Sequence, residues 1–181
     1  MHKMGLNGAP MADLYIDDCR VPKENRLGGE GQGARIFSDS MEWERTYILA
    51  WQIGVMERQV AEAARYAQER KLSGKPISTF QAVSHRIADM RIRLEAARWL
   101  LYRAAWLKSE GKPASMESAI AKVFAAEAAV ASALDAIQIH GGYGYATEMG
   151  IERALRDAVG GRIYSGTSEV LRNIISDELG L

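Results

Sequence analysis

Cysteine and net charge are scarce in this sequence of 181 residues, which has one Cys, four Pro, and 23 Lys and Arg residues against 23 Asp and Glu residues. The single cysteine, Cys19, excludes an internal disulfide and fits a reducing compartment, so we expect a cytoplasmic protein. The balanced charge argues against nucleic acid as a partner, because proteins that bind phosphate backbones carry an excess of Lys and Arg. No apolar run approaches the length of a membrane span, and the N-terminus has no apolar signal core.

Several common catalytic and binding motifs are also missing. The histidines, His2, His85 and His140, have no metal-ligand spacing with one another or with the cysteine, so we expect no metal site. The glycines of residues 29–33 do not follow the G-x-G-x-x-G spacing and have no βαβ unit around them, so they are interpreted as a structural turn. Without a G-x-S-x-G segment, a hydrolase triad has no support.

The character of the sequence changes between residues 1–36 and residues 37–181. In the first part, Ala12–Asp18 alternates polar and apolar residues, which predicts a strand that ends near Val21. A lone strand leaves its edges unpaired, and the chain barely supplies partners for it. Residues 1–36 are therefore interpreted as the C-terminal remnant of a β-domain and the loop that follows it.

The second part has helical periodicity, interrupted where Gly and Pro disfavour continuation of a helix. The predicted helices run from Ser38 or Asp39 to about Arg70, from Thr79 to Glu110, from 115 to 139, from 148 to 160 and from 168 to 179. Long helices with short connections favour an antiparallel up-down arrangement. The expected fold is therefore mainly α, a bundle of the four-helix type.

Apolar residues at i+3 and i+4 spacing predict the face that each long helix turns to the core. The predicted faces are Ile48, Ile53 (or Trp51), Val55 and Val60 in the first helix, Val83, Ile87, Met90, Leu94, Ala97 and Leu101 in the second, and Ile120, Val123, Phe124, Ala131, Leu134 and Ile137 in the third. Ser115 is the predicted N-cap of the third helix. The many alanines of this helix allow neighbouring helices to approach closely.

Two segments predict a site for a phosphate-bearing ligand. Residues 138–145 join a helix end to a glycine turn, and residues 163–169 form a short loop that opens the last helix. Unpaired N–H groups and the helix dipole favour an anion at such positions. Glu44, beside Arg45 in the first turns of the first long helix, is a further candidate. It is either an acid that complements the helix dipole or a general base, and the residues alone leave both readings open.

Five ordered motifs cover essentially the whole chain: Lys3–Leu6 with Ala12–Pro22, Leu27–Gly33, Tyr66–Lys71 with Gly74-Lys75 and Phe80–Ala82, Gln138–Gly144, and Ile163–Glu169. Together they resemble the flavin-dependent acyl-CoA dehydrogenases. The resemblance implies the C-terminal half of such an enzyme, namely the end of its middle β-domain followed by its C-terminal helical bundle. It also implies α,β-dehydrogenation of an acyl thioester, in which a carboxylate removes the α-proton and FAD accepts the β-hydride.

The resemblance implies a role for each matched residue. Ser165 stands where many members of the family carry the catalytic acid, and its hydroxyl is too weak a base to replace that acid. A minority branch that includes isovaleryl-CoA dehydrogenase has the glutamate immediately before an arginine, early in the first bundle helix. Glu44 is therefore the implied catalytic base and Arg45 the implied substrate-binding residue. The implied FAD-binding residues are Arg70, Gln81, Gln138, Gly141, Gly142, Thr167 and Glu169. Gly141 and Gly142 are equally well explained by a tight turn.

Two positions depart from the family pattern. Ser73 replaces a phenylalanine that usually packs on the cofactor of the adjacent subunit, and Gly160-Gly161 replaces bulkier residues. The implied partners are an acyl-CoA or acyl-carrier thioester, an electron-transfer flavoprotein, and further copies of the chain in a tetramer or dimer. Two alternatives stay open. One is a non-catalytic subunit that oligomerises or supports a partner chain, and the other is a related flavoenzyme that acts on carrier-protein thioesters or performs flavin oxygenation.

Overall fold

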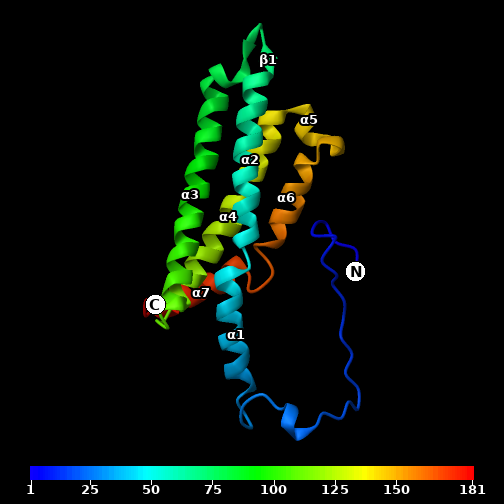
Figure 1. The fold of residues 1–181 in the computed structure, drawn as a ribbon, viewed down its shortest axis with the longest axis vertical. Helices are drawn as coiled ribbons and strands as arrows, with labels where there is room; N and C mark the ends of the chain where they lie inside the picture. Colours follow the sequence, from blue (N-terminus) through cyan, green and yellow to red (C-terminus); the bar gives the residue numbers. More distant parts are fainter.

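The computed structural model describes residues 1–181 and consists mainly of helices, as the sequence predicts (Figure 1). In chain order the helical elements are η1 (Lys23–Asn25), α1 (Gly33–Tyr47), α2 (Ala50–Glu69), η2 (Ile77–Thr79), α3 (Gln81–Ser109), α4 (Ser115–His140), α5 (Gly142–Tyr145), η3 (Thr147–Met149), α6 (Ile151–Gly160) and α7 (Ser168–Glu178). Two short strands, β1 (Lys71–Leu72) and β2 (Lys75–Pro76), pair as an antiparallel hairpin. The long helices α2, α3 and α4 run side by side with α6, which confirms the predicted bundle.

α4 lies in the middle of the bundle and packs against α2, α3, α6 and α7. Its buried positions are mainly alanines, and longer side chains from α2 and α3, such as Met56, Leu94 and Leu101, fill the core around them. The predicted core face of this helix is therefore wrong, since Phe124 and Leu134 are 36% and 51% exposed. Interiors are close-packed, and the small side chains are the ones that let the other helices come near to α4.

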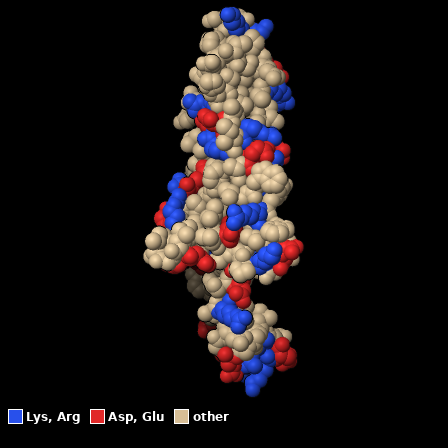
Figure 2. All heavy atoms as spheres, turned by 90° about the vertical axis from the view of Figure 1, so that its left-hand side faces the viewer, with Lys and Arg blue, Asp and Glu red and all other residues tan.

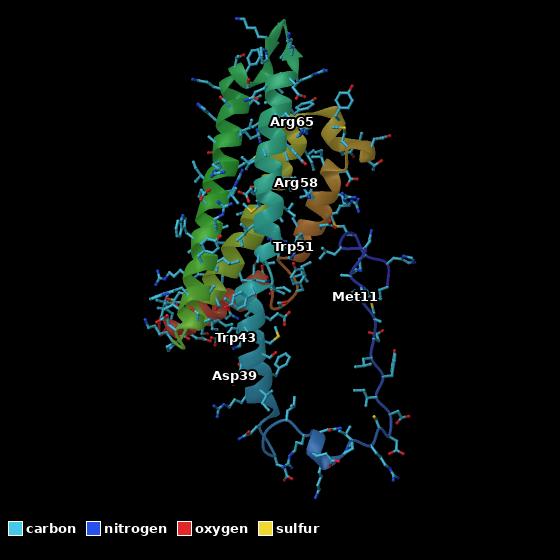
Figure 3. The ribbon with its side chains drawn as sticks, in the orientation of Figure 1. Met11, Asp39, Trp43, Trp51, Arg58 and Arg65 are labelled. Carbon is cyan, nitrogen blue, oxygen red and sulfur yellow. The ribbon has the colours of Figure 1, made fainter.

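The predicted core faces of the other two long helices agree better with the residues that the structure buries. α3 buries residues at i+3 and i+4 spacing that belong to the predicted face, namely Met90, Leu94, Ala97 and Leu101. On α2, Ile53 is buried, whereas Trp51 is 38% exposed. Trp51, Arg58 and Arg65 recur every seven residues along α2 and project away from the core (Figure 3).

The first predicted helix begins earlier than expected and is two helices. α1 begins at Gly33, and the chain bends at Ile48 and Leu49 before α2 continues. Neither Gly nor Pro marks the bend, which is why the sequence does not predict it. The bend carries Leu49 into the core, where it is 2% exposed.

The predicted N-cap of α4 is also wrong. Ser115 is the first residue of the helix and Ala114 takes the cap position, without a side-chain hydrogen bond. In the hairpin that separates α2 from α3, Ser73 and Gly74 occupy the turn with φ values of +52° and +81°. Positive φ at both central residues matches the twist of a two-residue hairpin.

The N-terminal segment contains no strand, so the strand predicted over Ala12–Asp18 is wrong. The segment is extended, and Leu14, Tyr15 and Ile16 are 85%, 87% and 73% exposed. A strand needs a partner for its backbone groups, and this chain supplies none at that position. Figure 3 shows Met11 on this segment, well away from α1.

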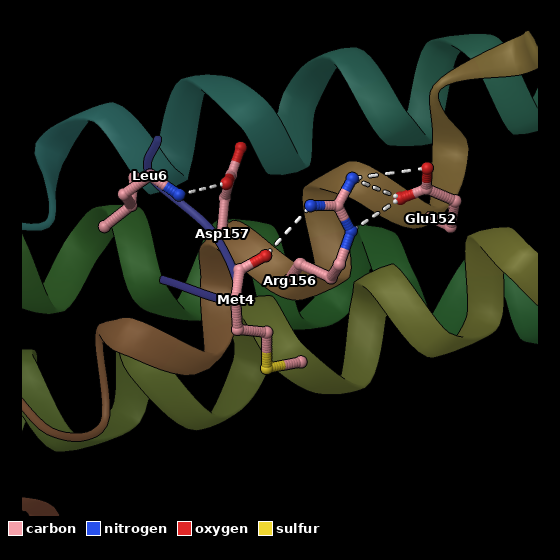
Figure 4. Close-up of polar contacts among 5 residues, drawn as sticks. All are labelled: Met4, Leu6, Glu152, Arg156 and Asp157. Carbon is pink, nitrogen blue, oxygen red and sulfur yellow. Dashed lines mark hydrogen bonds and ion pairs between the residues drawn. The ribbon is translucent and has the colours of Figure 1, made fainter. Parts of the chain in front are cut away.

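Residues 4–6 nevertheless dock on α6 (Figure 4). The backbone N–H of Leu6 donates to Asp157 Oδ1 at 2.5 Å, and Arg156 Nη1 donates to the Met4 carbonyl at 2.9 Å. Glu152 holds the same guanidinium from the other side at 3.0 Å. Gly5 lies between these two hydrogen bonds with its backbone directly against that of α6.

A Gly5→Ala substitution is expected to release the N-terminal segment. A Cβ at this position would stand 2.5 Å from the carbonyl carbon of Arg156 and 2.7 Å from the Asp157 nitrogen, and a helix backbone cannot yield. Tryptic cleavage after Lys3 and Arg20 should become faster, while the helices remain resistant. Gly8→Ala is the matched control, because a Cβ there meets nothing within 4 Å. Equal cleavage of the two variants would contradict this account of the docking.

The surface of the bundle carries charges of both signs. Viewed from the α3 side, Lys and Arg atoms are interspersed with Asp and Glu atoms over most of the bundle (Figure 2). No helix combines the length and the apolar content needed to cross a lipid bilayer.

Candidate functional site

Glu44 lies in the last turn of α1, because this helix ends at Tyr47. The C-terminal end of a helix carries partial negative charge, which disfavours a carboxylate there. The reading of Glu44 as an acid that complements the helix dipole is therefore wrong. Its side chain is exposed, and Oε1 accepts a hydrogen bond from the hydroxyl of Ser165.

Ser165 belongs to the loop of residues 161–167, which joins α6 to α7. Ser165 and Gly166 have φ values of +57° and +95°, a region natural for glycine and unusual for serine. Arg45 Nε donates to the Ser165 carbonyl at 3.3 Å, and the same guanidinium lies beside Gly166. The structure thus brings together Glu44, Arg45 and Ser165, which are far apart along the chain.

The loop also contacts Lys122, a residue that the sequence reasoning missed. Lys122 lies in α4, is 1% exposed, and donates from Nζ to the Gly166 carbonyl at 2.6 Å. Its ammonium lies 5.8 Å from the centre of the Tyr164 ring. One signal was available in the sequence, because Lys122 is the only charged residue between Glu117 and Glu127 in an alanine-rich segment.

A separate hollow of about 540 Å³ opens where α2 and α4 end, near the hairpin. Arg70, Gly141 and Gly142 line it together with Tyr66 and Tyr143. Gly141 has φ +59° and ends α4, so a turn accounts for this glycine. Gly142 has no such requirement, and a Cβ on it would enter open space. A guanidinium beside a bare backbone suits the phosphates of a ligand.

The remaining predicted cofactor residues do not line this hollow. Gln81 and Gln138 are exposed and do not line that hollow. Thr167 and Glu169 line another hollow of about 180 Å³, beside the loop that carries Ser165. The Thr167 hydroxyl caps α7 by accepting from Val170 N at 3.3 Å.

The Glu169 carboxyl belongs to this second hollow. Hydrogen bonds from its own backbone N–H and from the Thr167 hydroxyl lower its pKa, so the group is held as an anion at the start of α7. The predicted cofactor residues therefore form two groups, one near the hairpin and α5 and the other beside α7, at opposite ends of the bundle (Figure 1).

Comparison with known proteins identifies the family to which the chain belongs. Residues 31–180 match the family model described as acyl-CoA dehydrogenase, C-terminal domain. An L-prolyl-[peptidyl-carrier protein] dehydrogenase of Pseudomonas fluorescens is 47% identical over the whole chain, which spans 48% of that relative. The mitochondrial short-chain specific acyl-CoA dehydrogenase of Mus musculus is 43% identical over 98% of the chain and 43% of its own length.

Solved structures agree with this assignment. The structure of the prolyl acyl carrier protein oxidase AnaB matches with a TM-score of 0.98 and 45% identity, and a structure of PigA with FAD and proline matches with a TM-score of 0.96 and 39% identity. The whole chain is covered in both comparisons, and it spans 48% and 47% of those chains. The chain thus spans about half the length of the relatives it matches. It belongs to the acyl-CoA dehydrogenase family and carries that family's C-terminal helical domain.

Proposed function

We propose that this chain is the C-terminal part of a flavin-dependent dehydrogenase that removes hydrogen from the α and β carbons of an acyl thioester, with Glu44 as the base. The contact between Glu44 and Ser165 carries the proposal. It places a carboxylate from α1 directly on the loop whose serine replaces the acid of other family members. Glu44 thus supplies from a neighbouring helix the carboxylate that the loop lacks.

Ser165, Glu44 and Arg45 have different roles in the removal of the α-proton. The Ser165 hydroxyl occupies Glu44 Oε1 and fixes the carboxylate, which leaves Oε2 to take the proton. Arg45 Nε donates a hydrogen bond to the Ser165 carbonyl and so holds the loop. The terminal nitrogens of Arg45 are left to bind the pantetheine side of the substrate. A base positioned in this way contributes about 10²- to 10⁴-fold to a rate.

FAD, when bound, supplies the hydride acceptor for the β carbon. The residues present fit such a cofactor at two places. Arg70 and the open backbone of Gly142 suit its phosphates, and Thr167 and Glu169 lie beside the loop that carries Ser165, where the flavin would meet the substrate.

The two hollows lie at opposite ends of the bundle, which supports a homo-oligomer. We propose that each chain contributes one end to its own cofactor and the other end to the cofactor of a neighbour, in a dimer or tetramer. Large apolar side chains on the outer faces of α3 and α4 support this assembly: Ile92, Trp99, Tyr102 and Trp106 on α3, and Phe124 and Leu134 on α4. Figure 2 shows wide uncharged areas on the α3 side.

The substrate carrier is proposed from the relatives. Two of them act on prolyl groups held by a carrier protein, and we propose a carrier-bound acyl or prolyl thioester as the second candidate beside acyl-CoA. Electrons would leave through an electron-transfer flavoprotein. The exposed free thiol of Cys19 supports a reducing, cytoplasmic setting.

Flavin retention tests the cofactor part of this proposal. Purified protein is incubated with FAD and freed of excess flavin, and its visible spectrum is recorded. Arg70→Ala is expected to weaken retention about 10- to 100-fold, because a hydrogen bond to a charged group contributes roughly 1.5–3 kcal/mol. Arg65→Ala is the matched control, since Arg65 lies on the exposed side of α2 and does not line the hollow with Arg70 (Figure 3).

The reaction itself is tested by adding a thioester to the FAD-loaded protein. Loss of the visible flavin absorbance with butyryl-CoA would support acyl-CoA as the substrate. Loss only with a prolyl group on a carrier protein would support the second candidate. A loaded protein that keeps its flavin oxidised with every thioester would contradict the proposed activity.

A further inference from the structure

Lys122 is a buried cation without a carboxylate partner. It is 1% exposed in the alanine-rich face of α4, and no carboxylate oxygen lies within 4.0 Å of its ammonium group. An uncompensated buried charge is strongly disfavoured, and such a group persists in a fold where its position is over-determined or used. What the ammonium does contact is the Gly166 carbonyl at 2.6 Å.

The carbonyls of Ser165 and Gly166 are both held by cations. Arg45 on α1 binds the first at 3.3 Å, and Lys122 on α4 binds the second at 2.6 Å. Ser165 and Gly166 both have positive φ, a strained conformation for a serine that persists only where the surroundings enforce it. With both carbonyls turned to the cations, the Ser165 side chain points to Glu44.

The charged groups around Lys122 come from two helices, α1 and α7, and the loop contributes a neutral phenol. Burial, and then the charge of Arg45, lower the pKa of the Lys122 ammonium from 10.5 to about 8, while Glu169 on α7 and Glu44 on α1 act in the opposite direction. Tyr164 faces it from the loop, and burial raises the pKa of that phenol, so the phenol stays neutral throughout the range in which Lys122 titrates.

We propose that Lys122 is a positioning residue, which together with Arg45 clamps the two loop carbonyls and so turns the Ser165 hydroxyl onto Glu44. This inference rests on the proposed role of Glu44 as the base and adds the device that holds that base in place. The clamp is charged at a pH well below 8, and it weakens as Lys122 loses its proton through its pKa of about 8. Loop geometry therefore follows the protonation of a residue that never touches the substrate.

Backbone amide resonances of Ser165 and Gly166, followed from pH 6 to pH 10 in this chain, test the proposal. Both resonances are expected to shift with a midpoint near pH 8. In Lys122→Met, which keeps an unbranched side chain one atom shorter and removes the ammonium, that transition should disappear.

Lys112→Met is the matched control. Lys112 is an exposed lysine that lies over the Trp106 ring at 4.4 Å, in the connection between α3 and α4. Its removal should leave the transition of the Ser165 and Gly166 amides unchanged. A transition that survives in Lys122→Met, or that is absent from the wild type, would overturn the clamp.

A denaturation series keeps the proposal testable if the loop resonances broaden. The folded pKa of Lys122 is about 8 and the unfolded value is 10.5, so between these values the unfolded state binds more protons. Stability from this group therefore rises with pH across that window. As the pH rises from 8 to 10, the denaturation midpoint of the wild type should increase relative to the midpoint of Lys122→Met. A difference between the two midpoints that stays constant over this range would show that Lys122 does not titrate as a buried group.

These measurements need no cofactor, so they separate the clamp from the proposed reaction. If Lys122 controls the loop while Glu44→Gln retains the full dehydrogenase rate, the proposed base is wrong and the clamp stands. If Glu44→Gln abolishes the rate while the loop ignores Lys122, the base stands and the clamp is wrong.

Discussion

Replacing Glu44 with Gln is expected to slow flavin reduction by an acyl thioester about 10²- to 10⁴-fold in the FAD-loaded protein. Gln has the shape of Glu and still accepts a hydrogen bond from Ser165, but it cannot take the α-proton. Thioester affinity should change little, so the loss should appear in the maximal rate of stopped-flow flavin bleaching.

Asp39→Asn is the control for this substitution. Asp39 lies on the same helix, nearer its start than Trp43 (Figure 3), and pairs only loosely with Arg35 at 3.9 Å. Both variants remove one carboxylate charge from α1, and Asp39→Asn should keep the wild-type rate. A Glu44→Gln protein that bleaches as fast as the control would remove Glu44 from the mechanism.

The second large effect is expected at Gly144, where Gly144→Ala should lower the free energy of unfolding by about 3 kcal/mol, the upper end for overpacking a core. A Cβ there would run into the carbonyl oxygen of Ile137 and stand 2.9 Å from its Cα. Backbone atoms of α4 cannot give way as a flexible side chain can. The midpoint of thermal unfolding should fall by about 6–12 °C.

Gly142→Ala, two residues earlier, is the matched variant and separates folding from binding. A Cβ on Gly142 meets nothing within 4 Å, so its thermal midpoint should stay the same or rise slightly. Its flavin retention should nevertheless fall, because the added methyl group occupies the open side of the hollow lined by Arg70. Equal unfolding midpoints for the two variants would contradict the close approach of Gly144 to α4. Unchanged flavin retention in Gly142→Ala would mean that no ligand approaches this glycine.

Much of the fold could be predicted because hydrophobic periodicity and chain breakers report on local structure. α3 follows its predicted face, and α2 ends close to the predicted position before the Ser73-Gly74 turn. The bend at Leu49 escaped prediction because packing, and no local signal, produces it. The face of α4 was inverted for a physical reason. Hydrophobicity favours large residues such as Phe124 for the core, while close helix packing selected the alanines.

The candidate site could be predicted only as separate residues. The family resemblance singled out Glu44, Arg45 and Ser165 one by one, but the contact between Glu44 and Ser165 joins positions 121 residues apart. Local sequence patterns do not predict contacts between residues so far apart in the sequence. Lys122 was passed over because a lone lysine in a helix is normally solvated, and only the packing of α4 shows that this one is buried.

The central helix α4 joins the two sites, since it contains Lys122 and ends immediately before Gly141, and this limits how the chain can change in length. Lys122 and Gly141 are 19 positions apart, about 28 Å along the helix axis. One inserted residue between them would rotate one site by about 100° relative to the other. An insertion of two full turns would restore the orientation and still separate the sites by about 10 Å more. Insertions and deletions should therefore be tolerated in the connections around α4 and excluded between residues 122 and 141.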